Sequence, residues 1–209
     1  MTRSVLIADD HALIRQGVKG AMESDGRFIV LGEAEDGIKT IVAVRKQQPD
    51  ILVLDIAMPH SNGIEVIGEV GRWSSNTKIL ILTGLTTGSI LRQAREAGAQ
   101  AIFLKSDPMT DIIEAAATIA EGRTTYSSRV AEVLDQPPVG SDLTSRERQV
   151  LQGLLRGETI MAIADRFAIS VNTVDKHRAS IMRKLSVHSA GELMALAHRE
   201  GLLEAAKFT

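Results

Sequence analysis

Short apolar runs alternate with longer amphipathic segments over the first part of the chain. Five apolar runs predict β-strands, at residues 4–8, 28–34, 51–55, 78–83 and 101–105. Most of them are apolar at consecutive positions, which is typical of strands buried on both faces of a parallel sheet. Helical spacing of apolar side chains predicts helices at 11–24, 36–47, 63–71, 87–98 and 108–121. The alternation predicts an α/β domain, with a doubly wound sheet of five parallel strands covered by helices on both faces.

The pattern changes after Gly122. The segment DQPPVGSD at 135–142 is rich in residues that favour turns and linkers. Beyond it no run is strand-like, and helices are predicted at about 144–156, 159–167, 171–184 and 189–206. Thr144 with Glu147 fits a capping box, and Ser170 is placed to cap the third of these helices. We therefore expect a first domain at 1–122, a linker at 123–142 and a second, smaller all-α domain at 143–209.

Composition and charge add to this division. The 209 residues are 44% hydrophobic and 24% charged, and no apolar run approaches the roughly 18 residues of a membrane span. Without an export signal we expect a cytoplasmic protein with no membrane partner, and without cysteine there is no disulfide or thiolate metal site. The net charge of -2 hides an asymmetry. Residues 143–209 hold 10 Lys+Arg against 7 Asp+Glu, and the remainder holds 14 against 19, so the two parts suggest separate functions.

Polar side chains stand at the carboxyl ends of four of the predicted strands: Asp9, Asp10, Asp55, Thr83 and Lys105. Loops from several strands converge at this edge of a parallel sheet, where ligands bind. Three carboxylates held together repel one another unless a cation or a proton intervenes, so they predict a Mg²⁺ site. A lysine can pair with an anion and a threonine hydroxyl can donate to a phosphoryl oxygen. The set predicts a phosphoryl-transfer site with a carboxylate as acceptor.

Each of these residues also has a structural interpretation when taken alone. Asp9 or Asp10 is placed to cap the helix that begins near His11, Lys105 to be solvated and Thr83 to close a turn. Asp55 resists such an interpretation, because an ionised acid at the end of a buried strand is costly without a partner.

The strings LIADDH, LVLDIAMPHSNGIE, ILT and AIFLK together resemble the receiver domains of two-component response regulators, over about residues 3–122. The resemblance implies that Asp55 accepts a phosphoryl group from a sensor histidine kinase. It implies that Asp10, Asp55 and the backbone carbonyl of Ala57 ligate Mg²⁺, with Asp9 assisting through water. It also implies that Lys105 pairs with the phosphoryl group and that Thr83 moves to bond it.

One position departs from the receiver pattern. Such receivers usually carry an aromatic residue three positions before the lysine, and its rotamer reports phosphorylation. Here that position is Ile102, and the aromatic residue is Phe103. Because a shift of one residue along a strand places the side chain on the opposite face, Phe103 does not substitute for the missing switch residue.

The string IMAIADRFAISVNTVDKHRASIMRKL at 160–185 has the pattern of a helix, a tight turn at 168–170 and a second helix. The apolar residues that let the two helices pack are Ile163, Ala164, Phe167, Val174, Ile181 and Leu185. The second helix also offers polar and cationic side chains suited to phosphates and base edges in a major groove. They are Asn172, Thr173, Lys176, His177, Arg178, Arg183 and Lys184.

Residues 143–197 resemble the LuxR-type helix-turn-helix output domain, and the whole chain resembles response regulators of the NarL/FixJ class. The resemblance implies that 171–184 is the recognition helix on double-stranded DNA, that Lys184 and Thr173 meet phosphates, and that 189–206 pairs in a homodimer. Asp175 and Ala190 depart from residues common in the family. These two positions leave the preferred DNA sequence open.

We therefore expect a transcription regulator controlled by phosphorylation of Asp55, and not an enzyme. An aspartyl-phosphate hydrolase is a rival, but by family resemblance it needs a second acid two residues after the first, where this chain has Ala57. The other rival is a phosphorylation-independent regulator whose receiver serves as a dimerisation platform, and Ile102 is the feature that favours it.

Overall fold

The computed structural model describes residues 2–58 and 63–202. Most residues up to Asp135 form one compact unit, and the residues after it form another. Within the described part of the chain no helix is both long and apolar enough to cross a membrane.

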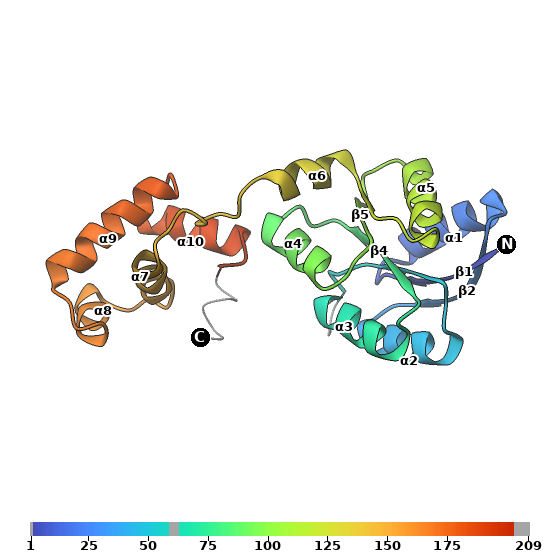
Figure 1. Cartoon of the computed structure of the whole chain (residues 1–209), viewed down its shortest axis with the longest axis horizontal. Helices are drawn as coiled ribbons and strands as arrows, with labels where there is room; N and C mark the ends of the chain where they lie inside the picture. Colours follow the sequence, from blue (N-terminus) through green and yellow to red (C-terminus); the bar gives the residue numbers. More distant parts are fainter. Residues whose placement is uncertain (1, 59–62, 203–209) are drawn as a thin grey trace. The chain divides into compact units, whose positions relative to one another are not determined.

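The first unit is built on a parallel sheet (Figure 1). Its strands are β1 (Arg3–Ala8), β2 (Phe28–Ala34), β3 (Ile51–Leu54), β4 (Lys78–Thr83), β5 (Ala101–Leu104) and β6 (Thr125–Tyr126). Their order across the sheet is β2-β1-β3-β4-β5-β6, and every pair of neighbours is parallel. The predicted doubly wound sheet is thus confirmed, with one strand more than predicted.

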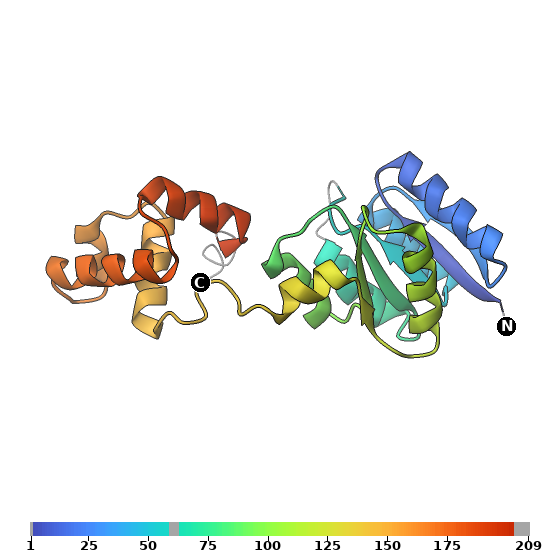
Figure 2. The same cartoon turned by 90° about the horizontal axis from the view of Figure 1, so that it is seen from above.

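Helices cover both faces of this sheet, as Figures 1 and 2 show. They are α1 (Ala12–Asp25), α2 (Gly37–Gln47), α3 (Gly63–Trp73), α4 (Gly88–Glu96), α5 (Met109–Ala120) and α6 (Ser128–Asp135). Buried residues of α1 and α5, such as Val18 and Ile112, pack in one apolar cluster. Those of α2, α3, α4 and α6, such as Val44, Ile67 and Leu91, pack in the other. The two helical layers bury the central strands on both faces of the sheet.

The register of the central strands sets the position of the polar residues that follow them. Ala8 pairs with Leu54, so Asp9 and Asp55 leave adjacent strands at the same level, and the Asp55 amide donates to the Ala8 carbonyl at 2.8 Å. In the same way the Lys105 amide donates to the carbonyl of Thr83, at 2.8 Å. The carboxyl edge of the sheet therefore gathers all four residues.

The predicted linker at 123–142 needs correction in its first part. Residues 125–126 form β6 alongside β5, where the amides of Thr125 and Ser127 donate to the carbonyls of Gln100 and Ile102. The short helix α6 then buries Val130 and Leu134 in the apolar cluster of α2, α3 and α4. A strand of two residues and a helix of eight are too short to show a hydrophobic period, which explains why the sequence did not predict them.

The second unit is all-helical, with α7 (Ser145–Leu155), α8 (Ile160–Arg166), α9 (Val171–Lys184) and α10 (Ala190–Arg199). The capping box of Thr144 and Glu147 and the cap from Ser170 are both present. Val150, Ile163 and Ile181 are fully buried in the core that the helices share. Between α8 and α9 the chain turns through Ala168, whose φ is 52°. The helix predicted at 189–206 is too long, because α10 ends at Arg199 and the chain turns at Gly201, whose φ is 68°. Residues 203–206 of that prediction lie outside the described residues.

Candidate functional site

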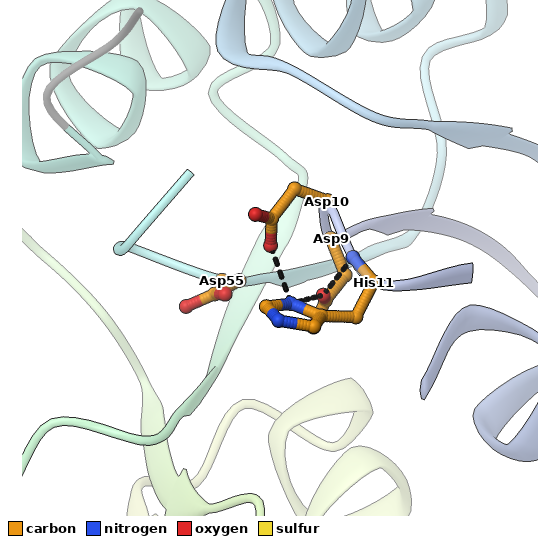
Figure 3. Close-up of side chains that lie close together, drawn as sticks. All are labelled: Asp9, Asp10, His11 and Asp55. Atoms are coloured by element: carbon orange, nitrogen blue, oxygen red, sulfur yellow. Dashed lines mark hydrogen bonds and ion pairs between the residues drawn. The ribbon is translucent and has the colours of Figure 1, made fainter. Parts of the chain in front are cut away.

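An acidic cluster lies at the carboxyl edge of the sheet. Asp9 follows β1 and Asp55 follows β3, and their exposed fractions are only 2% and 1%. Asp10 and His11 complete the cluster, and one ligand atom from each of the four residues lies within 4.8 Å of the others. Figure 3 shows the three carboxylates and the imidazole ring around one small region. The sequence predicted the three acids but not the histidine.

Lys105 closes the cluster from the end of β5. Its Nζ lies 2.6 Å from Asp55 Oδ2 and 2.7 Å from Asp9 Oδ2. Burial lowers the pKa of Lys105, but the hydrogen bonds to Asp55 and Asp9 outweigh that effect, so the pKa is raised above its usual value. The ammonium group is therefore firmly charged and holds the two buried carboxylates together.

The charges of this acidic cluster do not balance. Three carboxylates face one ammonium group, which leaves two negative charges when the imidazole is neutral. Buried carboxylates without matching positive charge are costly, and a hard divalent cation with oxygen ligands removes that cost. The donor set thus fits Mg²⁺, which receiver domains generally bind at such a cluster.

The loop after β3 orients the Asp55 side chain. The Ala57 amide donates to Asp55 Oδ1 at 2.9 Å, while Lys105 holds the other oxygen. Both oxygens of the carboxylate are therefore fixed before any ligand arrives. The Met-Pro motif continues into residues 59–62, which lie outside the described residues.

Thr83 ends β4, the neighbour of β3, and Ile102 lies on β5, the next strand across the sheet; both residues are fully buried. Thr83 Oγ1 accepts a hydrogen bond from the Leu85 amide at 3.0 Å, so the hydroxyl now serves the turn after β4. Ile102 packs in the cluster beneath α3 and α4, whereas Phe103 packs on the opposite face with α5. The expectation that Phe103 faces away from the position of the usual switch residue is confirmed.

The helix α9 presents most of its predicted polar side chains away from the core. Asn172, Lys176 and Arg183 are exposed, and Thr173, His177 and Arg178 are half-buried. Thr173 has a local partner, since its hydroxyl lies 2.8 Å from Ser170 Oγ at the start of the helix. Val174 and Ile181 anchor the opposite side of α9 in the core. The apolar side of α9 is thus packed in the core, and its polar side faces the solvent.

Lys184 differs from these residues because its ammonium group has partners inside the domain. Its Nζ lies 2.7 Å from Glu147 Oε2 and 2.9 Å from the Asp142 carbonyl. Glu147 also accepts from Ser180 Oγ at 2.6 Å and from the Thr144 amide at 2.7 Å. The hydrogen bond from Lys184, followed by those from Ser180 and Thr144, holds the pKa of Glu147 well below its usual range. One carboxylate therefore caps α7 and ties it to α9.

Comparisons with known families agree with this division. Residues 5–117 match the response regulator receiver domain, and residues 141–197 match the bacterial regulatory proteins of the luxR family. The first match covers residues of the first unit apart from Thr87–Ser89, and the second match falls within the second unit.

Relatives align with this protein over nearly their whole length. The oxygen regulatory protein NreC of Staphylococcus epidermidis is 31% identical over 96% of this chain and 99% of its own. The probable transcriptional regulatory protein NarL of Mycobacterium tuberculosis is 32% identical over 96% of this chain and 95% of its own. Both alignments therefore span the two units of this chain.

Solved structures are similar over nearly the whole chain. The response regulator RcsB of Salmonella typhimurium superimposes with a TM-score of 0.82 at 26% identity, covering 94% of this chain and 100% of RcsB. A structure of two RcsB dimers bound to two parallel DNAs gives a TM-score of 0.76 at 26% identity, covering 95% of this chain and 99% of RcsB. Proteins of this family regulate transcription by binding DNA and are not enzymes. The chain belongs to the response regulators of the NarL/FixJ class, as a DNA-binding transcription regulator with a receiver domain and a LuxR-type output domain.

Proposed function

We propose that phosphorylation of Asp55 by a sensor histidine kinase controls the dimerisation of this protein and its binding to promoter DNA. The observation that carries the proposal is the Asp55 carboxylate, which is buried at the sheet edge and fixed at both oxygens by Lys105 and the Ala57 amide. The protein then works in the cytoplasm, where a kinase and the chromosome are both within reach.

Mg²⁺ is the cofactor that this site fits. Asp10, Asp55 and the backbone carbonyl of Ala57 would hold the ion, and Asp9 would assist through a water molecule. When bound, the ion neutralises negative charge on the phosphoryl oxygens as they approach the carboxylates.

The residues of the chain supply the acceptor and the positive charge. One oxygen of Asp55 forms a bond to phosphorus as the bond between phosphorus and the donor breaks, so the leaving group keeps that electron pair. Lys105 now holds Asp55 Oδ2 at 2.6 Å, and its contact passes to a phosphoryl oxygen in the product. It keeps its ion pair with Asp9 throughout.

Thr83 couples the modified site to the rest of the domain. Its oxygen accepts from the Leu85 amide, and its hydroxyl hydrogen donates to the phosphoryl group once the turn after β4 moves inward. Phosphorylation adds a charge of about -1.5 to -2. A population shift requires that the active form stabilise this charge better than the inactive form does, and Thr83 and Lys105 supply that difference.

The second unit supplies DNA binding through α9 as recognition helix. The side chains expected at phosphates and base edges are Asn172, Thr173, Lys176, His177, Arg178 and Arg183. Lys184 contributes chiefly by holding α9 against α7, because its ammonium group already bonds Glu147. RcsB has been solved bound to a promoter in the presence of a phosphomimetic, which supports coupling between receiver and DNA in this class.

A phosphorylation-independent regulator is the second candidate, and Ile102 favours it. At this position the usual aromatic switch residue is missing, and Ile102 is fully enclosed in the apolar cluster. In that case the receiver serves as a dimerisation platform, and DNA affinity does not respond to the phosphoryl group.

One experiment separates the two candidates. Wild type and Asp55→Asn are incubated with Mg²⁺ and a small-molecule phosphodonor, and intact mass and DNA affinity are recorded on the same samples. We expect a phosphoryl adduct on wild type alone, its loss with a chelator, and tighter DNA binding only where the adduct forms. An adduct without a change in DNA affinity would support the second candidate, and the absence of any adduct on wild type would refute the first.

A further inference from the structure

We propose that the helix α6 is released from the receiver when Asp55 is phosphorylated, and that Arg92 on α4 is the residue that holds α6 in the unphosphorylated form. The inference deepens the proposed function and rests on it, because the phosphoryl group on Asp55 is the signal for release. It supplies a route from the phosphorylation site to the end of the receiver that does not pass through an aromatic residue at position 102.

The helix α6 depends on the rest of the receiver for its stability. It has eight residues, and isolated helices shorter than about 12 residues are marginal in water. Its residues Val130 and Leu134 are buried in the apolar cluster that α2, α3 and α4 share. The strand β6 before it has only two residues and pairs with β5 alone. Few contacts therefore keep α6 in place, and the loss of one of them weakens its attachment.

Arg92 supplies a hydrogen bond that the end of α6 cannot make within the helix. The helical partner of the Val133 carbonyl would be the amide of residue 137, but that residue is Pro137, which has no N–H group. Arg92 Nη2 donates to the Val133 carbonyl instead, at 2.9 Å. The helix dipole also favours a cation at this end of α6. The contact joins α6 to α4, which lies next to it in Figures 1 and 2.

The contacts of α4 continue to Thr83. Leu85, in the turn after β4, packs against the same apolar cluster as α6, and its amide donates to Thr83 Oγ1 at 3.0 Å. In the proposed function this turn moves inward with Thr83 once Asp55 carries a phosphoryl group. The helix α4 follows the turn in the chain and moves with it. Arg92 then loses its position opposite the Val133 carbonyl.

The release of α6 changes the reach of the chain between the two units. The first unit ends at Asp135, the last residue of α6, and the chain then enters the second unit. Eight residues span about 12 Å as a helix and up to about 26 Å when extended. A released α6 therefore gives the second unit more freedom to meet another copy of the chain on DNA.

The test measures hydrogen–deuterium exchange in the full chain, by mass spectrometry of peptides that cover α6. Wild type is treated with Mg²⁺ and a small-molecule phosphodonor, and intact mass reports the adduct on Asp55. We expect the α6 amides to exchange at least fivefold faster in the sample with the adduct. Peptides from α1, which packs in the other apolar cluster, are expected to keep their rate.

Two arginine variants test the contact without a phosphodonor. Arg92→Met keeps an unbranched apolar stem and removes the donor. A hydrogen bond from a charged donor typically shifts an equilibrium by about tenfold or more, but Arg92 is only half-buried and water competes for the contact. We therefore expect α6 to exchange about five- to tenfold faster than in untreated wild type. The matched control is Arg95→Met, an exposed position on the same helix, which should leave the exchange of α6 unchanged.

The single tyrosine of the chain provides a second measurement. Tyr126 stands just before α6 and packs against the same apolar cluster. Replaced by fluorotyrosine, it gives one ¹⁹F NMR signal, which we expect to move in the same direction in phosphorylated wild type and in untreated Arg92→Met.

Equal exchange of α6 in Arg92→Met and Arg95→Met would overturn the inference. The proposed function fails in a distinguishable way, since its failure shows as the absence of an adduct on Asp55 or as DNA affinity that ignores the adduct. An adduct that tightens DNA binding but leaves the exchange of α6 unchanged overturns this inference alone.

Discussion

Gly63 gives α3 its close approach to the loop that carries Asp55. A β-carbon placed on this residue would lie 2.7 Å from Ile56 Cβ and 2.8 Å from the Ile56 carbonyl oxygen. These atoms belong to the backbone and the branch point of a neighbour of Asp55, so no flexible side chain can move aside. Gly63→Ala therefore forces the loop or the first turn of α3 to shift.

The size of the effect follows from these contacts. Overpacking by one carbon typically costs about 1 to 3 kcal/mol of unfolding free energy. At a denaturant slope of about 2 kcal/mol/M in urea, the midpoint of the first unit falls by about 0.5 to 1.5 M. Because the shift falls beside Asp55, the rate of phosphorylation is expected to fall as well.

The assay uses the single tryptophan of the chain, which lies at the end of the same helix. Trp73 is 43% exposed and stacks beneath the guanidinium group of Arg45 at 3.9 Å, so its fluorescence follows unfolding of the first unit. The matched control is Gly68→Ala in the exposed middle of α3, where an added β-carbon meets nothing within 4 Å. There we expect a gain of about 0.5 to 1 kcal/mol. Equal shifts for the two variants would refute the steric argument.

Three further predictions concern the remaining residues. The pKa of Glu147 is lowered in the folded protein, so the stability that its carboxylate contributes is present above the ordinary pKa of 4.5 and is lost as the pH falls further. In acid titrations followed by NMR signals of α7 and α9, the stability of Glu147→Gln should therefore depend less on pH than that of wild type. Lys176→Ala should reduce the slope of log DNA affinity against log salt concentration by about 0.9. Lys184→Gln should instead lower the melting temperature of the second unit and leave that slope unchanged. Equal slopes in the two variants would contradict the assignment of Lys176 to DNA and of Lys184 to the α7–α9 contact. Thr83→Val keeps the volume but lacks the hydroxyl, so the adduct should still form on Asp55 while the DNA response weakens; a full response would remove Thr83 from the coupling.

The parts of the fold that the sequence predicts well are the segments long enough to show a repeating pattern of apolar residues. The five longer strands and the helices that follow them each bury a regular set of apolar residues, as Leu52 and Leu54 in β3 and Ile67 in α3 illustrate. Parallel pairing then places Asp9 and Asp55 at one edge without further information, because neighbouring parallel strands end on the same side.

Contacts between side chains are where the sequence is silent. His11 stands next to two aspartates in the chain, but adjacency does not say whether its ring turns toward them. Lys184 appears as one cation among several on α9, yet a partner 37 residues away takes up its charge. The hydroxyl of Thr83 likewise bonds a local amide in this state. Such choices depend on three-dimensional packing, which no local pattern encodes.

The short strand β6 has a practical consequence for anyone who wishes to study the receiver by itself. A chain cut at Gly122 would leave β5 as the outermost strand, and the carbonyls of Gln100 and Ile102 would lose the amides that now cover them. It would also remove Val130 and Leu134 from the apolar cluster, which would expose apolar side chains beside the unpaired edge of β5. Unpaired edges of this kind recruit strands from other molecules. A dimer observed with such a fragment would result from the truncation and not from phosphorylation. A fragment that ends at Asp135 keeps β6 paired with β5.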